Sequence, residues 1–188
     1  MRKAVVSVVV ATALGLAAAA AAPPAIADSD EVTSLTIAAT LGSDGRIDVT
    51  QTIEVSFAAP NRGLDVPLSV ASEFSTDNTQ SLTYSDITVT SPTGAPVNAH
   101  TVWGSSLGVV QVGDPNSPVN GAQTYVVSYS VDGTVWDPGS HDLSVDLDWT
   151  PVAAGWQMLI GQVSVTLTGP SAPKSVGSSA SGGSCYLY

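Results

Sequence analysis

Three aspartates with the chemistry of calcium ligands lie in the segment HDLSVDLDWT, residues 141–150. Asp142, Asp146 and Asp148 fall on one face of a predicted strand, opposite a row of apolar side chains. Carboxylates are preferred calcium ligands, but residues two apart on a strand are separated by about 6.5 Å. A calcium site at these three aspartates would therefore need a further oxygen from a nearby loop, such as one from Asp114 or Asp137.

A simpler interpretation of the same three aspartates competes with the metal site. Alternating charged and apolar residues are typical of a strand with one solvated face, and charges there discourage edge-to-edge pairing of sheets. Calcium is therefore the only cofactor that we consider, and the expected default is no cofactor.

A second candidate site consists of two tryptophans. Trp136 lies in the turn-rich segment VDGTVWDPGSHD, and Trp156 follows Ala153-Ala154-Gly155, so we expect both to be partly exposed. Exposed aromatic side chains stack on sugars or anchor protein partners. Trp136 and Trp156 could therefore line a binding edge, although large aromatic residues more often close the end of a core.

Residues suited to catalysis are few. His100 and His141 are the only histidines, and each lies near a predicted strand boundary. Ser171 and Lys174 have the S-x-x-K spacing of serine acyl enzymes, but that motif requires a helix start within a folded site. Proline and the surrounding linker composition exclude such a helix here. We assign no catalytic residue and expect a protein that is not an enzyme.

The chain that must position these residues alternates between apolar and polar residues from Leu35 onward. This period of two is typical of strands that bury one face. In residues 82–90 the apolar parity changes between Tyr84 and Ile87, which predicts a bulge or a turn in the strand. The four clearest buried rows are Ile47, Val49, Ile53, Val55 and Phe57; Tyr125, Val127, Tyr129 and Val131; Leu143, Val145, Leu147 and Trp149; and Val163, Val165 and Leu167.

Turn residues separate the predicted strands. Asp44-Gly45, Thr93-Gly94, Asn120-Gly121 and Asp132-Gly133 tolerate positive φ, and the prolines lie between strands. Eight or nine short strands at this spacing favour an all-β, immunoglobulin-like antiparallel β-sandwich over a closed barrel.

The two ends of the chain differ from this pattern. Arg2 and Lys3 precede an apolar stretch, and Ala25-Ile26-Ala27 precedes Asp28. This pattern predicts a helical signal peptide over 1–27 and export of the protein. A retained signal anchor is the alternative. The β-sandwich domain is expected over 28–168. Residues 169–188 are rich in Gly, Ser and Pro and predict a flexible tail. Cys185 is the only cysteine, so no intrachain disulfide can form.

Charge excludes one class of function. The chain carries a formal net charge of −11, and without residues 1–27 its three basic residues face sixteen acidic ones, a net charge of −13. Binding to phosphate backbones depends on Lys and Arg, so we expect no nucleic-acid partner. The charge favours solubility and weakly favours cations or basic partners.

Several short motifs together resemble a known family. Asp44-Gly45, Val112-Gly113-Asp114, Tyr125 with Tyr129, and Asp148-Trp149 are similar to the pattern of the N-terminal extracytoplasmic domain of the predicted bacterial membrane proteins called domain of unknown function 2207. Gln51 stands where the family commonly has Glu, and Thr150 stands where Asn usually follows Trp. The resemblance implies a fold and a location at the membrane, and it supplies no catalytic residues.

The resulting functional prediction is a non-catalytic interaction module at the bacterial envelope, exported to the extracellular side or to the outer face of the cell membrane. Its expected partner is an envelope or membrane protein. Apart from the signal sequence, we expect no transmembrane segment in this chain. The alternative is a module that binds a glycan or calcium.

Overall fold

The computed structural model describes residues 29–75, 78–136, 146–169, 176–178 and 185–187. This part of the chain contains strands and no helix, which confirms the all-β prediction, and so it also holds no helix that could cross a membrane. The strands are β1 (Glu31–Leu41), β2 (Ile47–Asn61), β3 (Gly63–Ser69), β4 (Ala71–Ser75), β5 (Asn78–Ser81), β6 (Thr83–Thr90), β7 (Ala99–Trp103), β8 (Leu107–Gly113), β9 (Val119–Asp132), β10 (Val135–Trp136), β11 (Asp146–Trp149), β12 (Leu159–Ile160), β13 (Val163–Thr168), β14 (Val176–Ser178) and β15 (Cys185–Leu187).

The largest sheet is built around β2, which pairs antiparallel with β1 and β9. Ile53 lies opposite Leu35 on one side and Tyr125 on the other, and all three are buried. The polar residues that alternate with the buried row of β2, such as Asp48 and Thr50, are exposed. The two-residue period therefore predicted the buried face of this sheet correctly.

The two edges of this six-stranded sheet are formed by β6 and by β12 with β13. Whereas β6 pairs antiparallel with β9, both β12 and β13 run parallel to β1. The expected sheet was wholly antiparallel, so the parallel edge is a departure from that expectation.

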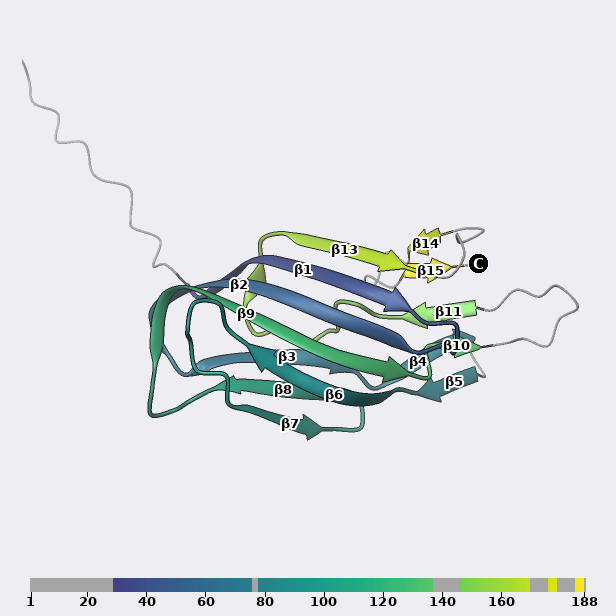
Figure 1. Ribbon diagram of the computed structural model, residues 1–188, viewed down its shortest axis with the longest axis horizontal. Helices are drawn as coiled ribbons and strands as arrows, with labels where there is room; N and C mark the ends of the chain where they lie inside the picture. The colour runs from purple at the N-terminus through teal and green to yellow at the C-terminus, as the bar shows by residue number, and fades with distance from the viewer. Residues whose placement is uncertain (1–28, 76–77, 137–145, 170–175, 179–184, 188) are drawn as a thin grey trace, which may run out of the picture.

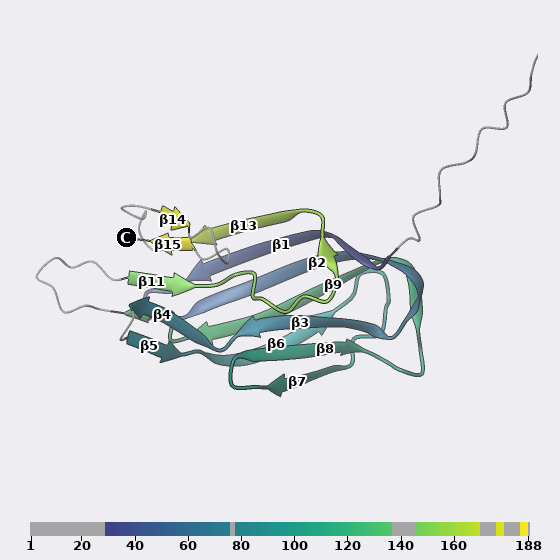
Figure 2. The ribbon, with the colours of Figure 1, turned by 180° about the vertical axis from the view of Figure 1, so that it is seen from behind.

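A second layer covers part of the buried face. The three-stranded sheet β3-β8-β7 faces the large sheet, and the core lies between them (Figure 1). From behind, β11 and the chain that follows it run between β13 and β3 (Figure 2). Leu147 and Trp149 of β11 are buried within the same core.

Two short strands lie within 169–188, the range expected to be a flexible tail. β15 pairs with β11, and β14 pairs with β15, so that they complete a four-stranded sheet with β10. The hairpin of β4 and β5 lies at the same end of the molecule (Figure 1). The immunoglobulin-like strand arrangement stays a prediction.

Two local expectations have different outcomes. The predicted irregularity between Tyr84 and Ile87 is confirmed, because the pairing of β6 with β9 shifts register between Ser85 and Thr88, where Asp86 has a φ of 55°. The predicted burial of Val163 and Val165 is wrong, because both side chains are exposed.

Candidate functional site

The predicted calcium ligands are not all within the described residues. Asp142 lies outside them, and for Asp146 only the strand backbone is described, in register with Trp136. Asp148 is buried and its N–H donates to the carbonyl oxygen of Thr134 at 2.9 Å. In the described part of the chain, no three His, Cys, Asp or Glu side chains gather as metal ligands. The calcium site therefore stays a prediction.

The expectation of a solvated outer face on β11 is wrong at Asp148. Leu147, Asp148 and Trp149 are consecutive and all buried, so both faces of this strand are covered. β11 is not the free edge strand that the charges were expected to protect, because it lies between β10 and β15 in a small sheet that packs against the core.

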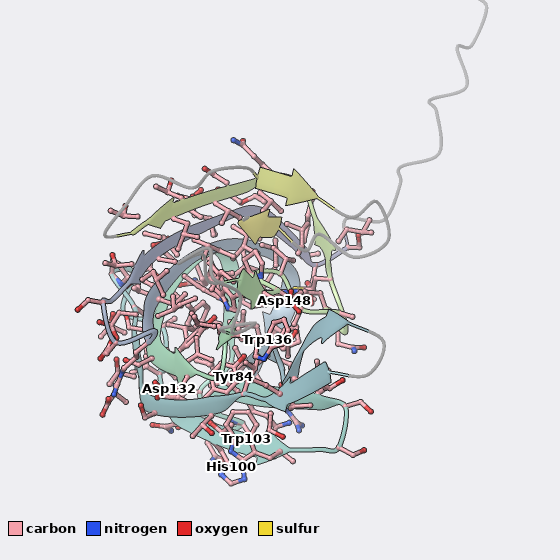
Figure 3. All side chains as sticks on the ribbon, turned by 90° about the vertical axis from the view of Figure 1, so that its right-hand side faces the viewer. Tyr84, His100, Trp103, Asp132, Trp136 and Asp148 are labelled. Carbon is pink, nitrogen blue, oxygen red and sulfur yellow. The ribbon has the colours of Figure 1, made fainter. Side chains whose placement is uncertain are left out.

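The two predicted binding tryptophans are half-buried. Trp156 packs against the core, and its indole Nε1 has no hydrogen-bond partner among the described residues. Trp136 is the last residue of β10, in the small sheet that also holds Asp148 (Figure 3). The two tryptophans come from different elements, and a shared binding edge at Trp136 and Trp156 stays a prediction.

The tryptophan that is most accessible among the described residues is instead Trp103, which is 49% exposed. Its ring stacks on Tyr84, with ring centroids 5.3 Å apart. It also lies over Gly108 of β8, where an added Cβ would be 2.2 Å from the ring. The glycine opposite Trp103 was the only sequence signal for this packing. Using that signal would have required knowledge of how β7 pairs with β8.

A chain of polar aromatic contacts leads inward from Trp103. Tyr84 contacts Tyr129 at a centroid distance of 5.4 Å, and Gln51 Nε2 donates to the Tyr129 hydroxyl at 2.9 Å. Tyr84 donates to the carbonyl of Ser69 at 2.7 Å. Burial raises the pKa of Tyr84 and of Tyr129 well above their usual range. Figure 3 shows Tyr84 on the inner side of Trp103.

Gln51 belongs to the buried row of β2 and is 1% exposed. Among the described residues, its Oε1 has no hydrogen-bond partner, and neither has the hydroxyl of buried Tyr125. A buried carbonyl oxygen without a partner costs free energy. The network thus organises the interior of the sandwich.

An open groove lies where β3 begins and β8 ends. It has a volume of about 730 Å³ and is lined by residues from the start of the domain, from β3, β7 and β8, and from the segment before β12. We call it the Arg62 groove and define it by Asp30, Arg62, Gly63, Asp65, His100 and Gly113.

Two arginines of the domain have contrasting surroundings. Arg46 Nη2 lies 2.6 Å from Asp86 Oδ2, and Arg46 Nε lies 3.7 Å from Asp48 Oδ1. Arg62 is exposed and has no ion-pair or hydrogen-bond partner for its side chain among the described residues. In an acidic chain, the Arg62 groove therefore holds a guanidinium that is free to bind an external group.

Two glycines in the lining of the groove face each other. Gly63 and Gly113 are paired residues of β3 and β8, with φ of 134° and 137°. A Cβ on Gly63 would lie 1.8 Å from the Val112 carbonyl oxygen, and a Cβ on Gly113 would lie 1.9 Å from that of Arg62. Only glycine fits at these two positions.

The two carboxylates of the groove are in different states. Asp30 accepts hydrogen bonds from Asn61 Nδ2 at 2.6 Å and from the N–H of Ala58 at 2.9 Å, so it fastens the start of the domain to the end of β2. Asp65 is exposed and, like Arg62, has no partner for its side chain in the described part of the chain. The groove thus presents one free cation and one free carboxylate.

A second feature is a pair of exposed apolar side chains on β13. Val163 and Val165 are 46% and 40% exposed. They are in register with buried Leu35 and Ile37, so their side chains point to the core side of the sheet, beyond the part that the second layer covers. We call these two residues the β13 ledge. Leu159 of β12 is 77% exposed, but it is in register with exposed Glu31 and lies on the other face of the sheet.

The backbone of the ledge is also available. The N–H of Leu35 donates to the carbonyl oxygen of Gln162, so the even-numbered residues of β13 face β1. The N–H and C=O groups of Val163 and Val165 consequently point away from β1. Among the described residues, no strand pairs with this outer edge.

Two of the motifs that carry the family resemblance serve as turns. Asp44 Oδ1 accepts from the N–H of Arg46, and Gly45 has a φ of 85°, between β1 and β2. Asp114 Oδ1 accepts from the N–H of Asn116 after β8. These side chains hold the backbone at the ends of strands.

Comparison with known proteins gives one family match. The family described as predicted membrane protein (DUF2207) N-terminal domain matches residues 31–184. No curated protein matches the sequence.

Similarity to solved structures is remote. The M1 zinc metallopeptidase from Deinococcus radiodurans is 10% identical, with a TM-score of 0.40 over 85% of this chain, which spans 38% of that protein. A non-cellulosomal cohesin from Archaeoglobus fulgidus is 10% identical, with a TM-score of 0.32 over 77% of this chain and 93% of the cohesin. TM-scores this low establish no shared function.

Proposed function

Because the chain belongs to the DUF2207 family of predicted membrane proteins and contains its N-terminal domain, we propose that this domain is a non-catalytic interaction module on the extracytoplasmic side of the bacterial membrane. Its partner is an extended apolar segment of another envelope protein, which adds as a strand to β13. The β13 ledge is the observation that carries this proposal.

The ledge combines the two requirements of strand addition. Main-chain groups of an edge strand supply affinity, and alternate side chains supply specificity. The outward backbone of Val163 and Val165 meets the first requirement, and their exposed apolar side chains meet the second. β13 carries no charged residue, so an apolar segment can approach this acidic domain there without burying a charge.

Export of the domain is part of the same proposal. The predicted signal peptide places the mature N-terminus at Asp28, directly before the described part of the chain. The intact mass of the exported protein tests this: a mass that begins at Asp28 supports cleavage, and one that includes residues 1–27 contradicts it.

Val165→Pro tests the strand addition. Proline removes the outward N–H of this residue, and an edge strand tolerates proline where the N–H faces solvent. We expect the variant to keep its far-ultraviolet circular dichroism and to lose partner capture. Capture is measured with a photoreactive phenylalanine analogue at position 163 in the full-length protein within the cell envelope.

Thr166→Lys is the matched control, because Thr166 is exposed on the opposite face of the same strand. It should leave crosslinking from position 163 unchanged. Crosslinks that persist in folded Val165→Pro would contradict the proposal. Crosslinks formed only between two copies of this chain would overturn the choice of partner, and the same experiment detects them by their mass.

A further inference from the structure

We propose that the Arg62 groove binds a short zwitterionic peptide, with the peptide carboxylate on Arg62 and the peptide ammonium on Asp65. This site is separate from the β13 ledge and does not depend on it. The inference combines the charges of the groove, the two glycines in its lining and its volume.

The charges select the kind of ligand. Arginine presents a planar fork of N–H donors that matches a carboxylate, and the side chain of Arg62 has no partner among the described residues. Asp65 and Asp30 place two carboxylates beside it, within a chain of net charge −11. A multiply charged anion would be repelled by these groups, whereas a ligand with one charge of each sign is complementary to them.

The lining of the groove includes two residues without side chains, Gly63 and Gly113, where a ligand can approach the backbone. Amide side chains of Asn98 and Gln111 border the same space and can hydrogen-bond peptide groups. The volume of about 730 Å³ is in the range of small-molecule sites.

The two free ionic groups belong to one short stretch of chain. Arg62 and Asp65 are three residues apart, and both line the groove. A short peptide with free ends carries one charge of each sign, so trialanine is the probe for both groups.

The experiment is calorimetric titration of the full-length protein with trialanine. We expect binding in the millimolar to micromolar range, and Arg62→Gln and Asp65→Asn should each weaken it by about tenfold or more, as expected when a charge-assisted hydrogen bond is lost. Arg46→Gln is the matched control, because Arg46 is paired with Asp86 outside the groove; it should leave the affinity unchanged.

Two further probes separate the alternatives. N-acetyl-trialanine amide carries no terminal charges and should not bind, and inorganic phosphate should neither bind nor compete. No heat with trialanine, equal binding of the blocked peptide, tighter binding of phosphate, or an equal effect of Arg46→Gln would each overturn the proposal. The folded Val165→Pro variant should bind trialanine like the unmodified protein, so a failure at the ledge is distinct from a failure at the groove.

Discussion

Two edges of the sandwich differ from the other two in how they resist the addition of a strand. β3 contains Pro67, which has no N–H to donate, and β6 contains a bulge at Asp86, whose carboxylate pairs with Arg46. β13 and β7 contain no proline, no bulge and no Lys, Arg, Asp or Glu. Proline, bulges and charge are the features by which proteins protect sheet edges.

Each sheet therefore has one closed and one open edge, and exposed apolar residues are found at the open ones. Val163 and Val165 lie on β13, and Val102 and Trp103 lie on β7. One proline, bulge or charged residue is enough to protect a sheet edge against strand addition. The unprotected edges are therefore not a necessary consequence of the fold. Trp103 of β7 is already stacked on Tyr84, and the partner is therefore placed at the other open edge, β13.

The largest expected effect concerns the closed edge at β3, which is held to β8 from Gly63 onward. Gly113→Ala would place a Cβ 1.9 Å from the Arg62 carbonyl oxygen. We expect the free energy of unfolding to fall by about 3 kcal/mol or more, as for other strained backbone positions. Urea denaturation measures it.

Gly121→Ala is the matched control, because Gly121 has a φ of 64° and nothing within 4 Å of its added Cβ. It should cost about 1–2 kcal/mol, the penalty of a left-handed conformation alone. Equal costs at Gly113 and Gly121 would show that the contact between β3 and β8 is not tight.

The next prediction compares a covered and an uncovered valine. Val127 is fully buried on β9, whereas Val165 on the β13 ledge is 40% exposed. Val127→Thr should lower the free energy of unfolding by about 1–3 kcal/mol, because the hydroxyl is buried. Val165→Thr should change it by about 0.5 kcal/mol or less. Similar losses in urea denaturation would mean that the ledge is covered within the domain itself.

The interior tyrosines predict a dependence on alkaline pH. Burial raises the pKa of Tyr129 above its ordinary value of about 10. The stability that this provides is complete below the unfolded-state pKa and is lost as the pH rises above it, because the unfolded chain then releases the proton. Urea denaturation at pH 9 and 11 should show the loss, and Tyr129→Phe should lose less over that range. An equal loss in the variant would assign the effect to other groups.

The smallest expected effect is on the closed edge at β6. Asp86→Asn keeps a residue that tolerates positive φ and removes the charge that pairs with Arg46. Both side chains are partly exposed, so stability should change by less than about 1 kcal/mol. Analytical ultracentrifugation should show more self-association than in the unmodified protein. An unchanged sedimentation profile would mean that the bulge alone protects this edge.

Much of the fold could be predicted because the alternation of apolar and polar residues along a strand indicates which face of the strand is buried. The buried rows of β2 and β9 and the bulge in β6 were all predicted from neighbouring residues. The Arg62 groove could not be found in this way, since Arg62 and Gly113 are distant in sequence and meet only when β3 pairs with β8. Gly113 belongs to the Val112-Gly113-Asp114 motif, which predicts a turn, and no motif of the sequence analysis includes Arg62.

By itself, the sequence determined that the chain is all β, which residues of β2 and β9 face inward, and where Asp44 and Asp114 turn the backbone. Only the tertiary structure decided that Val163 is exposed, that Asp148 is buried and that the side chain of Arg62 has no partner among the described residues. The physical reason is that alternation determines the side of a sheet to which a side chain points, whereas burial and pairing depend on the element that covers that side.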